Sequence, residues 1–232
     1  MTAAFSSPDD IGFLVGLKAE ASLLRQFFPN APIAISGATK EGARKGAARL
    51  TACGVPSVVS FGLAAGLDPA LRPGTILIPD VVVKDGKLFP CSPSLRRTLG
   101  ADSVPGVIGG ALLHSDEVVL TEEEKQRLSM ASGCCALDME SGFLAVAAQE
   151  AKRSFGVLRV VCDPADRTLP PAAGIALSPD GGLGVGPLLL SLLRDPLQIP
   201  ALIRLGSDAS RARQAMKRFL ELRNSLAGAD RS

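Results

Sequence analysis

The sequence predicts an α/β fold, a single-domain α/β/α sandwich with a mixed, mostly parallel central sheet. Short apolar runs alternate along the chain with segments whose apolar residues recur at helical spacing, as in a sheet covered by helices. A chain of 232 residues can bury one sizeable core, and no linker, repeat or low-complexity tract interrupts it. We therefore expect one domain over residues 1–232.

Strand and helix signals follow one another in the first half of the chain. "IGFLVG" (11–16) predicts a strand and "KAEASLLRQFF" a helix. "APIAISG" and "TKEGARKGAARLTACG" repeat this pair, with Thr39 as the N-cap and Gly54 as the stop of the helix. "PSVVSFGLAAG" is typical of a buried strand that enters a glycine-rich turn, and "GTILIPDVVV" supplies more strand residues.

The second half continues the alternation. "GVIGGALLH" predicts a strand, and "TEEEKQRLSMA" predicts a helix with Thr121 as its N-cap. A helix over about 139–152, with Asp138 as its cap, precedes the strand "FGVLRVVC". We expect a long irregular loop over about 166–187 and C-terminal helices over about 187–226, whose apolar residues share one stripe.

Composition argues against several functions. The 25 basic and 23 acidic residues are mixed along the chain, so no basic patch for nucleic acid is visible, and Tyr and Trp are absent. The five cysteines have no C-x-x-C spacing, and His114 is the one histidine. We therefore expect reduced thiols, no metal and no other cofactor.

The N-terminus lacks the pattern of a signal peptide, which indicates a cytoplasmic protein. The most apolar region, Leu183 to Leu205, is interrupted before about 20 apolar residues accumulate, by Arg194, Asp195, Pro196 and Pro200. This region should not span a bilayer. A peripheral position at the inner membrane face stays open.

Three candidate functional segments lie at the carboxyl ends of predicted strands, where ligands gather in such sheets. Glu20 follows the first strand, the turn at 62–66 follows another, and Asp163 comes directly after "FGVLRVVC". Arg159 lies four residues before Asp163, so both side chains should point to the same face of that strand.

Two motifs carry a resemblance to a known family. "SFGLAAGLDPALRPGTILIPD", together with "ALDMES" and "LRVVCDPAD", resembles the nucleoside phosphorylase/nucleosidase superfamily of purine phosphorylases and methylthioadenosine/adenosylhomocysteine nucleosidases. The tail "DRTLPP…LLSLLRDPLQIPALIRLGSDA" is similar to its hopanoid-associated branch, which is proposed to remove adenine from adenosylhopane. The resemblance implies cleavage of the N-ribosidic bond to adenine and ribosylhopane, by a homodimer that needs no cofactor.

The resemblance also implies roles for five residues. Asp163, kept protonated by burial, would give a proton or hydrogen bond to the purine N7. Glu140 would accept hydrogen bonds from the ribose hydroxyls and Met139 would contact the sugar or base. Glu20 would activate water, and Arg159 would help to hold that water and pair with Glu20 or ligand. Each residue also has a purely structural alternative. Asp163 could cap a turn, Glu140 could interact with the helix dipole, and Met139 could fill the core. Glu20 could be an exposed helix residue and Arg159 could form a salt bridge.

The nucleophile and the rest of the substrate leave alternatives open. Phosphorylases of this superfamily hold phosphate with an arginine and a serine near the glycine-rich turn. Here Gly62, Leu63 and Ala64 offer only backbone, which favours water, with phosphorolysis to phosphoribosylhopane as the alternative. Val118 and Val119 would pack on the purine. A small 5′-substituted adenosine such as methylthioadenosine or deoxyadenosine is a second candidate substrate. A third hypothesis is a non-catalytic protein that binds a nucleoside or a membrane partner.

Overall fold

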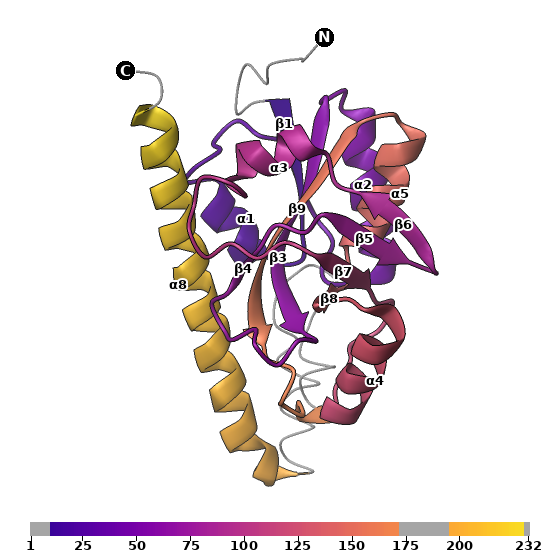
Figure 1. Cartoon of the computed structure of the whole chain (residues 1–232), viewed down its shortest axis with the longest axis vertical. Helices are drawn as coiled ribbons and strands as arrows, with labels where there is room; N and C mark the ends of the chain where they lie inside the picture. The colour runs from indigo at the N-terminus through magenta and orange to yellow at the C-terminus, as the bar shows by residue number, and fades with distance from the viewer. Residues whose placement is uncertain (1–9, 172–194, 230–232) are drawn as a thin grey trace.

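The computed structural model describes residues 10–171 and 195–229, which form a sheet covered by helices on both faces (Figure 1). The sheet has nine strands. They are β1 (Ile11–Val15), β2 (Ile33–Ile35), β3 (Ser57–Gly66), β4 (Ile76–Leu77), β5 (Val81–Lys84), β6 (Lys87–Pro90), β7 (Ala111–His114), β8 (Ala136–Asp138) and β9 (Ser154–Asp163).

The strand order along the sheet is β2-β1-β3-β8-β7-β5-β6, and β9 pairs with both β3 and β4. The pairs β1–β2, β1–β3, β3–β9, β5–β7 and β7–β8 are parallel. The pairs β3–β8, β4–β9 and β5–β6 are antiparallel. The predicted fold class, a mixed and mostly parallel sheet, is confirmed.

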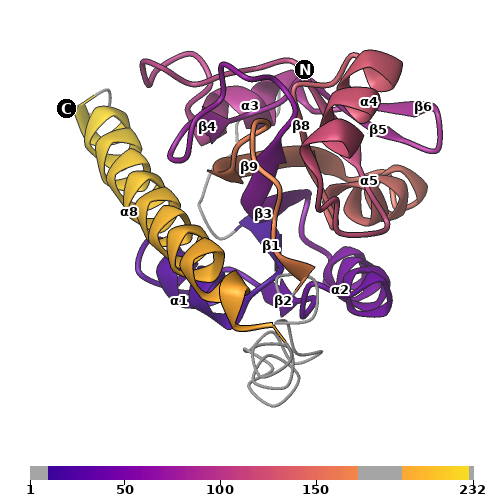
Figure 2. The ribbon, with the colours of Figure 1, turned by 90° about the horizontal axis from the view of Figure 1, so that it is seen from below.

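The helices are α1 (Lys18–Leu24), α2 (Lys40–Ala52), α3 (Pro93–Leu99), α4 (Glu122–Ser132), α5 (Ser141–Glu150) and α8 (Ile199–Ala229), with a short 3-10 turn, η2 (Pro196–Gln198), before α8. Helices α2 and α5 lie on one face of the sheet, and α1 and α8 lie on the other (Figure 2). Helix α8 is one long helix, whereas the sequence did not distinguish between one helix and two in this region.

Several local predictions are confirmed. The side chains of Thr39 and Thr121 cap α2 and α4 by accepting hydrogen bonds from the amides of Gly42 and Glu124. Gly54 follows the end of α2 with a φ of +82°, a conformation that favours glycine. The predicted loop at 166–187 lies outside the described residues from position 172 onward.

Other local predictions are wrong or incomplete. The helix predicted from residue 139 begins at Ser141, because the residues before it form β8, which pairs with β7 and with the end of β3. The hairpin of β5 and β6 and the helix α3 were not predicted. These short elements are held by strand pairing and by packing against β9, which local sequence patterns do not encode.

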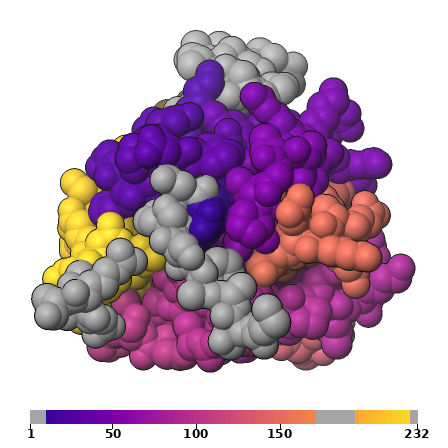
Figure 3. All heavy atoms as spheres, turned by 90° about the horizontal axis from the view of Figure 1, so that it is seen from above, coloured from indigo at the N-terminus to yellow at the C-terminus, as the bar shows by residue number. Residues whose placement is uncertain are grey.

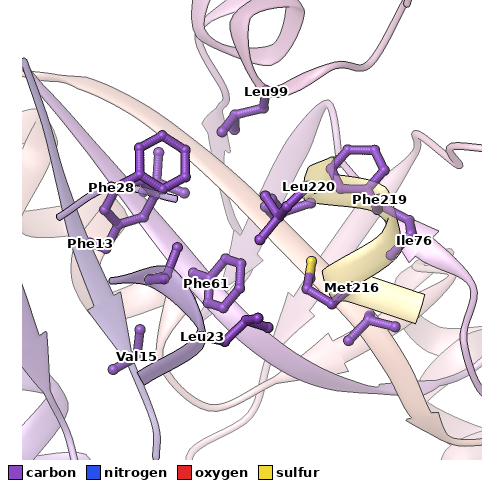
Figure 4. Packing of buried hydrophobic residues seen from close by; sticks show 14 of the residues in the cluster. Phe13, Val15, Leu23, Phe28, Phe61, Ile76, Leu99, Met216, Phe219 and Leu220 are labelled. Carbon is purple, nitrogen blue, oxygen red and sulfur yellow. The ribbon is translucent and has the colours of Figure 1, made fainter. Parts of the chain in front are cut away.

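The core has a large cluster on each face of the sheet, because alternate strand residues point to opposite sides, and a smaller third cluster around Leu67 and Leu137. On the α1/α8 face, Phe13 lies 4.9 Å from Phe28 and 6.4 Å from Phe61 between ring centroids. Met216 and Leu220 of α8 pack into this cluster (Figure 4). The space-filling view shows α8 in yellow at the edge of the molecule, against N-terminal residues in indigo (Figure 3).

All five cysteines are free thiols. In the described ranges, 10–171 and 195–229, no helix is both long and apolar enough to cross a membrane.

The apolar stripe of α8 predicts a large difference between two leucines that lie two residues apart. Leu220 is 1% exposed and Leu222 is 45% exposed. Leu220→Ala should lower the free energy of unfolding by about 2–5 kcal/mol, because it leaves a cavity in the core. Leu222→Ala should lower it by about 1 kcal/mol or less. Urea unfolding of both variants measures this difference, and equal losses would show that α8 does not pack as described.

Candidate active site

A cavity of about 470 Å³ opens where the carboxyl ends of β1, β3, β8 and β9 meet. Of the residues predicted for the site, all but one line it: Glu20, Leu63, Ala64, Val118, Val119, Met139, Glu140, Arg159 and Asp163. Gly62 lines an adjoining cavity of about 290 Å³ between α1, β3 and α8. The structure therefore brings together residues spread over more than 140 positions of sequence.

Arg159 is the central charge of the site and is almost completely buried. Its Nη2 lies 2.5 Å from Asp138 Oδ2 and 3.1 Å from Glu140 Oε2, and donates to Ser60 Oγ at 2.6 Å. Its Nη1 donates to the carbonyl oxygen of Leu63 at 3.1 Å. The guanidinium group thus joins β9 to β3, to the end of β8 and to the start of α5.

A glycine makes room for this arrangement. Gly62 pairs with Arg159 across β3 and β9 and has a φ of +151°. A Cβ atom at this position would lie 2.5 Å from Glu20 Oε1 and 2.8 Å from Arg159 Nη1, closer than real Cβ contacts. Gly62 therefore contributes to the site by having no side chain, since any other residue would displace both charged groups.

Glu20 is held by backbone amides. Its Oε2 accepts hydrogen bonds from the amides of Gly16 and Leu17, each at 2.9 Å, and its Oε1 accepts one from the amide of Leu63 at 3.0 Å. Burial raises the pKa of Glu20 to about 7, although the nearby Arg159 opposes that rise. An acid with this pKa can take up or release a proton near neutral pH.

The predicted pairing of Arg159 with Glu20 is wrong among the described residues. Arg159 forms its ion pairs with Asp138 and Glu140, while three amides already satisfy the carboxylate of Glu20. Arg159 still acts on Glu20 electrostatically and lowers its pKa.

Glu140 is the N-cap residue of α5 and lies one position before the first turn of the helix. The sequence predicts it inside that first turn. Its Oε1 accepts a hydrogen bond from Ser36 Oγ at 3.3 Å, and its Oε2 faces Arg159. Burial raises the pKa of Glu140, with Arg159 opposing the rise. Asp138, the predicted cap, is the last residue of β8 and lies two positions before the observed N-cap, although its side chain accepts a hydrogen bond from the amide of Ser141 at 3.2 Å.

Asp163 ends β9 on the same face as Arg159 and is 4% exposed. Its Oδ2 lies 2.6 Å from Nζ of Lys125, which comes from α4. The contact is an ion pair, and neither carboxyl oxygen has a hydrogen-bond partner of good geometry in the described part of the chain. Burial raises the pKa of Asp163, while Lys125 lowers it.

Sequence reasoning missed four polar partners in the site: Ser36, Ser60, Asp138 as the partner of Arg159, and Lys125. Ser60 could have been found, since it lies two residues before Gly62, the partner of Arg159 on the adjacent strand, and therefore points to the same face of the sheet. His114 and Asp116 are not among the residues that line the cavity. His114 Nε2 lies 3.2 Å from Asp116 Oδ1, behind the site.

Apolar residues form the other walls. They include Val118, Val119, Leu137 and Met139. Leu169 and the first turns of α8 also line the cavity, the latter through Leu202, Leu205, Gly206 and Ala209. Within the ranges that the structure describes, no group of three or more His, Cys, Asp or Glu side chains is arranged to hold a metal ion.

The cavity carries an excess of acids. Among the described residues that line it, Glu20, Asp138, Glu140 and Asp163 are acidic and Arg159 is the one base. Burial lowers the pKa of a guanidinium group, but the surrounding carboxylates outweigh it and raise the pKa of Arg159. Arg159 therefore stays charged, with its charge engaged by protein carboxylates.

Solved structures share this fold at low sequence identity. The 5′-methylthioadenosine/S-adenosyl homocysteine nucleosidase of Helicobacter pylori superimposes with a TM-score of 0.68 and 16% identity, over 93% of this chain and 97% of that one. The futalosine hydrolase of Helicobacter pylori strain 26695 gives a TM-score of 0.68 and 18% identity over the same shares. The Neisseria meningitidis 5′-methylthioadenosine/S-adenosylhomocysteine nucleosidase gives 0.65 and 15%, over 92% and 98%.

Sequence comparison identifies the family. No sequence among the curated proteins matches this chain. A family model described as the phosphorylase superfamily matches residues 33–175, a range that includes β3, β8 and β9 with Arg159, Glu140 and Asp163. Because this match covers more than half of the chain, the protein belongs to the phosphorylase superfamily.

Proposed function

We propose that this protein hydrolyses the N-ribosidic bond of adenosylhopane, releasing adenine and ribosylhopane, as a member of the hopanoid-associated branch. The observation that carries the hydrolase assignment is the cluster of buried carboxyls around Arg159, at the carboxyl ends of the strands. Buried carboxyls with raised pKa values are typical of catalytic acids and bases.

The carboxyls fit the charges that the reaction develops. Breaking the bond between C1′ and the purine leaves a cationic ribose and sends the bonding electron pair to the base. Burial raises the pKa of Asp163 and so favours its protonated form, which gives its proton to the purine. Glu140 accepts hydrogen bonds from the ribose hydroxyls and its charge stabilises the cation. Glu20 takes a proton from the water that attacks C1′.

In this proposal Arg159 acts as a positioning residue. It fixes the Glu140 carboxylate and the Leu63 carbonyl, and through its charge it keeps the pKa of Glu20 lower than burial alone would set it. This role differs from the direct hold on water expected from the sequence.

The charge balance favours water over phosphate. Phosphate is an anion and needs charge-assisted donors, whereas the one base among the described lining residues is already paired with Asp138 and Glu140. The glycine-rich turn adds Phe61 and Leu63, whose side chains have no donor. A phosphate ion would also be repelled by the ionised carboxylates of the cavity.

The apolar side of the cavity supports an apolar 5′ substituent. Leu202 and Leu205 face the cavity, and Leu197 and Ile203 on the same stretch are 88% and 67% exposed, which extends the apolar surface outward. Each methylene buried on such a surface contributes roughly 0.8 kcal/mol. The structural likeness to methylthioadenosine/adenosylhomocysteine nucleosidases supports a second candidate, a small 5′-substituted adenosine such as methylthioadenosine.

The pKa of Glu20 predicts the acid limb of the rate. Only ionised Glu20 can accept the proton of water, so kcat/KM should fall as the pH is lowered through about 7. Glu20→Gln should lower kcat about 10²–10⁴-fold and remove this limb. Adenine release measured from pH 5 to 9 checks both points. A wild-type rate that stays flat below neutral pH would contradict the role of Glu20.

Gly206 offers a test of the substrate. It lines both cavities, and a Cβ atom added there meets no atom within 4 Å, so Gly206→Leu should fold and fill the apolar space. Adenine release is measured from detergent-solubilised adenosylhopane and from methylthioadenosine. The variant should lose at least about tenfold in kcat/KM for adenosylhopane, with a smaller loss for methylthioadenosine.

Ser207→Leu is the matched control, since Ser207 is exposed and lines neither cavity. It should leave both substrates unaffected. A wild type that prefers methylthioadenosine, with equal losses for both substrates in Gly206→Leu, would favour the small-nucleoside candidate.

A further inference from the structure

A buried lysine lies behind Asp163 and has no part in the roles proposed above. Lys125 comes from the first half of α4 and is 0% exposed. Its Nζ lies 2.6 Å from Asp163 Oδ2 and donates to the carbonyl oxygens of Pro164 at 3.0 Å and Arg167 at 2.8 Å. The ammonium group thus donates two hydrogen bonds to the turn after β9 and forms an ion pair with the last residue of that strand.

The two backbone contacts do not explain the charge. They hold the turn after β9, which a neutral donor could do at a smaller desolvation cost. The third contact reaches a carboxyl group that lines the cavity, whereas Lys125 itself does not line it. A substrate would therefore meet Asp163, with the ammonium group directly behind it.

Other charges near Asp163 largely cancel. Arg167 and Asp208 both act on the Asp163 carboxyl, in opposite directions, and they form an ion pair with each other. Cys162, the neighbour of Asp163 on β9, has a pKa raised by burial to about 12 and stays a neutral thiol at ordinary pH. Lys125 is thus the positive charge that dominates at Asp163.

We propose that Lys125 is a positioning residue that stabilises the carboxylate formed when Asp163 gives its proton to the departing purine; this inference rests on the hydrolase function proposed above. The bond from C1′ to the purine breaks and its electron pair goes to the base. The O–H bond of Asp163 breaks, the purine gains that proton, and the electron pair stays on Asp163. Lys125 keeps its protons and faces the new negative charge.

This arrangement resolves a conflict in the demands on the acid. A general acid must hold its proton before the reaction and release it easily during it. Burial supplies the first condition and the ammonium group supplies the second, because its attraction grows as Asp163 becomes charged.

Two substitutions separate the charge from the backbone contacts. Lys125→Gln removes the charge but keeps two N–H donors for the carbonyls of Pro164 and Arg167, and Lys125→Met removes both. We expect each variant to lower kcat on the order of 10²-fold with a smaller change in KM. The alkaline limb, where Asp163 loses its proton, should move to higher pH, because Lys125 no longer lowers the pKa of Asp163.

The same lysine variants are then made in an Asp163→Asn background, with thermal unfolding to confirm that each variant is folded. If Lys125 acts through Asp163, Lys125→Gln should cost no more than about twofold there. Two results would overturn the inference: the same loss of kcat in both backgrounds, or a wild-type rate and alkaline limb in Lys125→Gln. Lys125 would then serve only to hold the turn after β9. A wild type that releases no base from any nucleoside would overturn the proposed function and this role together.

Discussion

The site depends on the burial of one guanidinium group. Arg159 is inside the sheet, where an unpaired charge would be very costly, so its neighbours must supply negative charge and acceptors. Asp138, Glu140, Ser60 and the Leu63 carbonyl do so, and they come from β8, the start of α5 and β3. These contacts fix where the charged side chains of the cavity lie.

The two halves of the proposed chemistry line the same cavity as this arginine. Glu20 is held by three backbone amides, and Asp163 is paired with Lys125. Burial raises the pKa of both acids, but a different cation opposes the rise in each case: Arg159 for Glu20 and Lys125 for Asp163. Two similar side chains can therefore serve as base and acid in one cavity.

Much of this could be predicted from the sequence, because it follows from short-range patterns. The alternation of two residues along β9 placed Arg159 and Asp163 on one face, and strand ends located Glu20 and the glycine-rich turn. The partners could not be predicted. β8 is three residues long and exists through pairing, and the helix expected from residue 139 begins only after it, at Ser141. Lys125 lies in a charged helix segment typical of a solvated surface.

The central claim is that this acid-rich cavity uses water as the nucleophile. The most direct test is adenine release by the purified protein in phosphate-free buffer and again with inorganic phosphate, with the sugar product followed by ³¹P NMR. The account predicts equal rates in both buffers and a free sugar without phosphorus. Release that requires phosphate and yields a sugar 1-phosphate would contradict it.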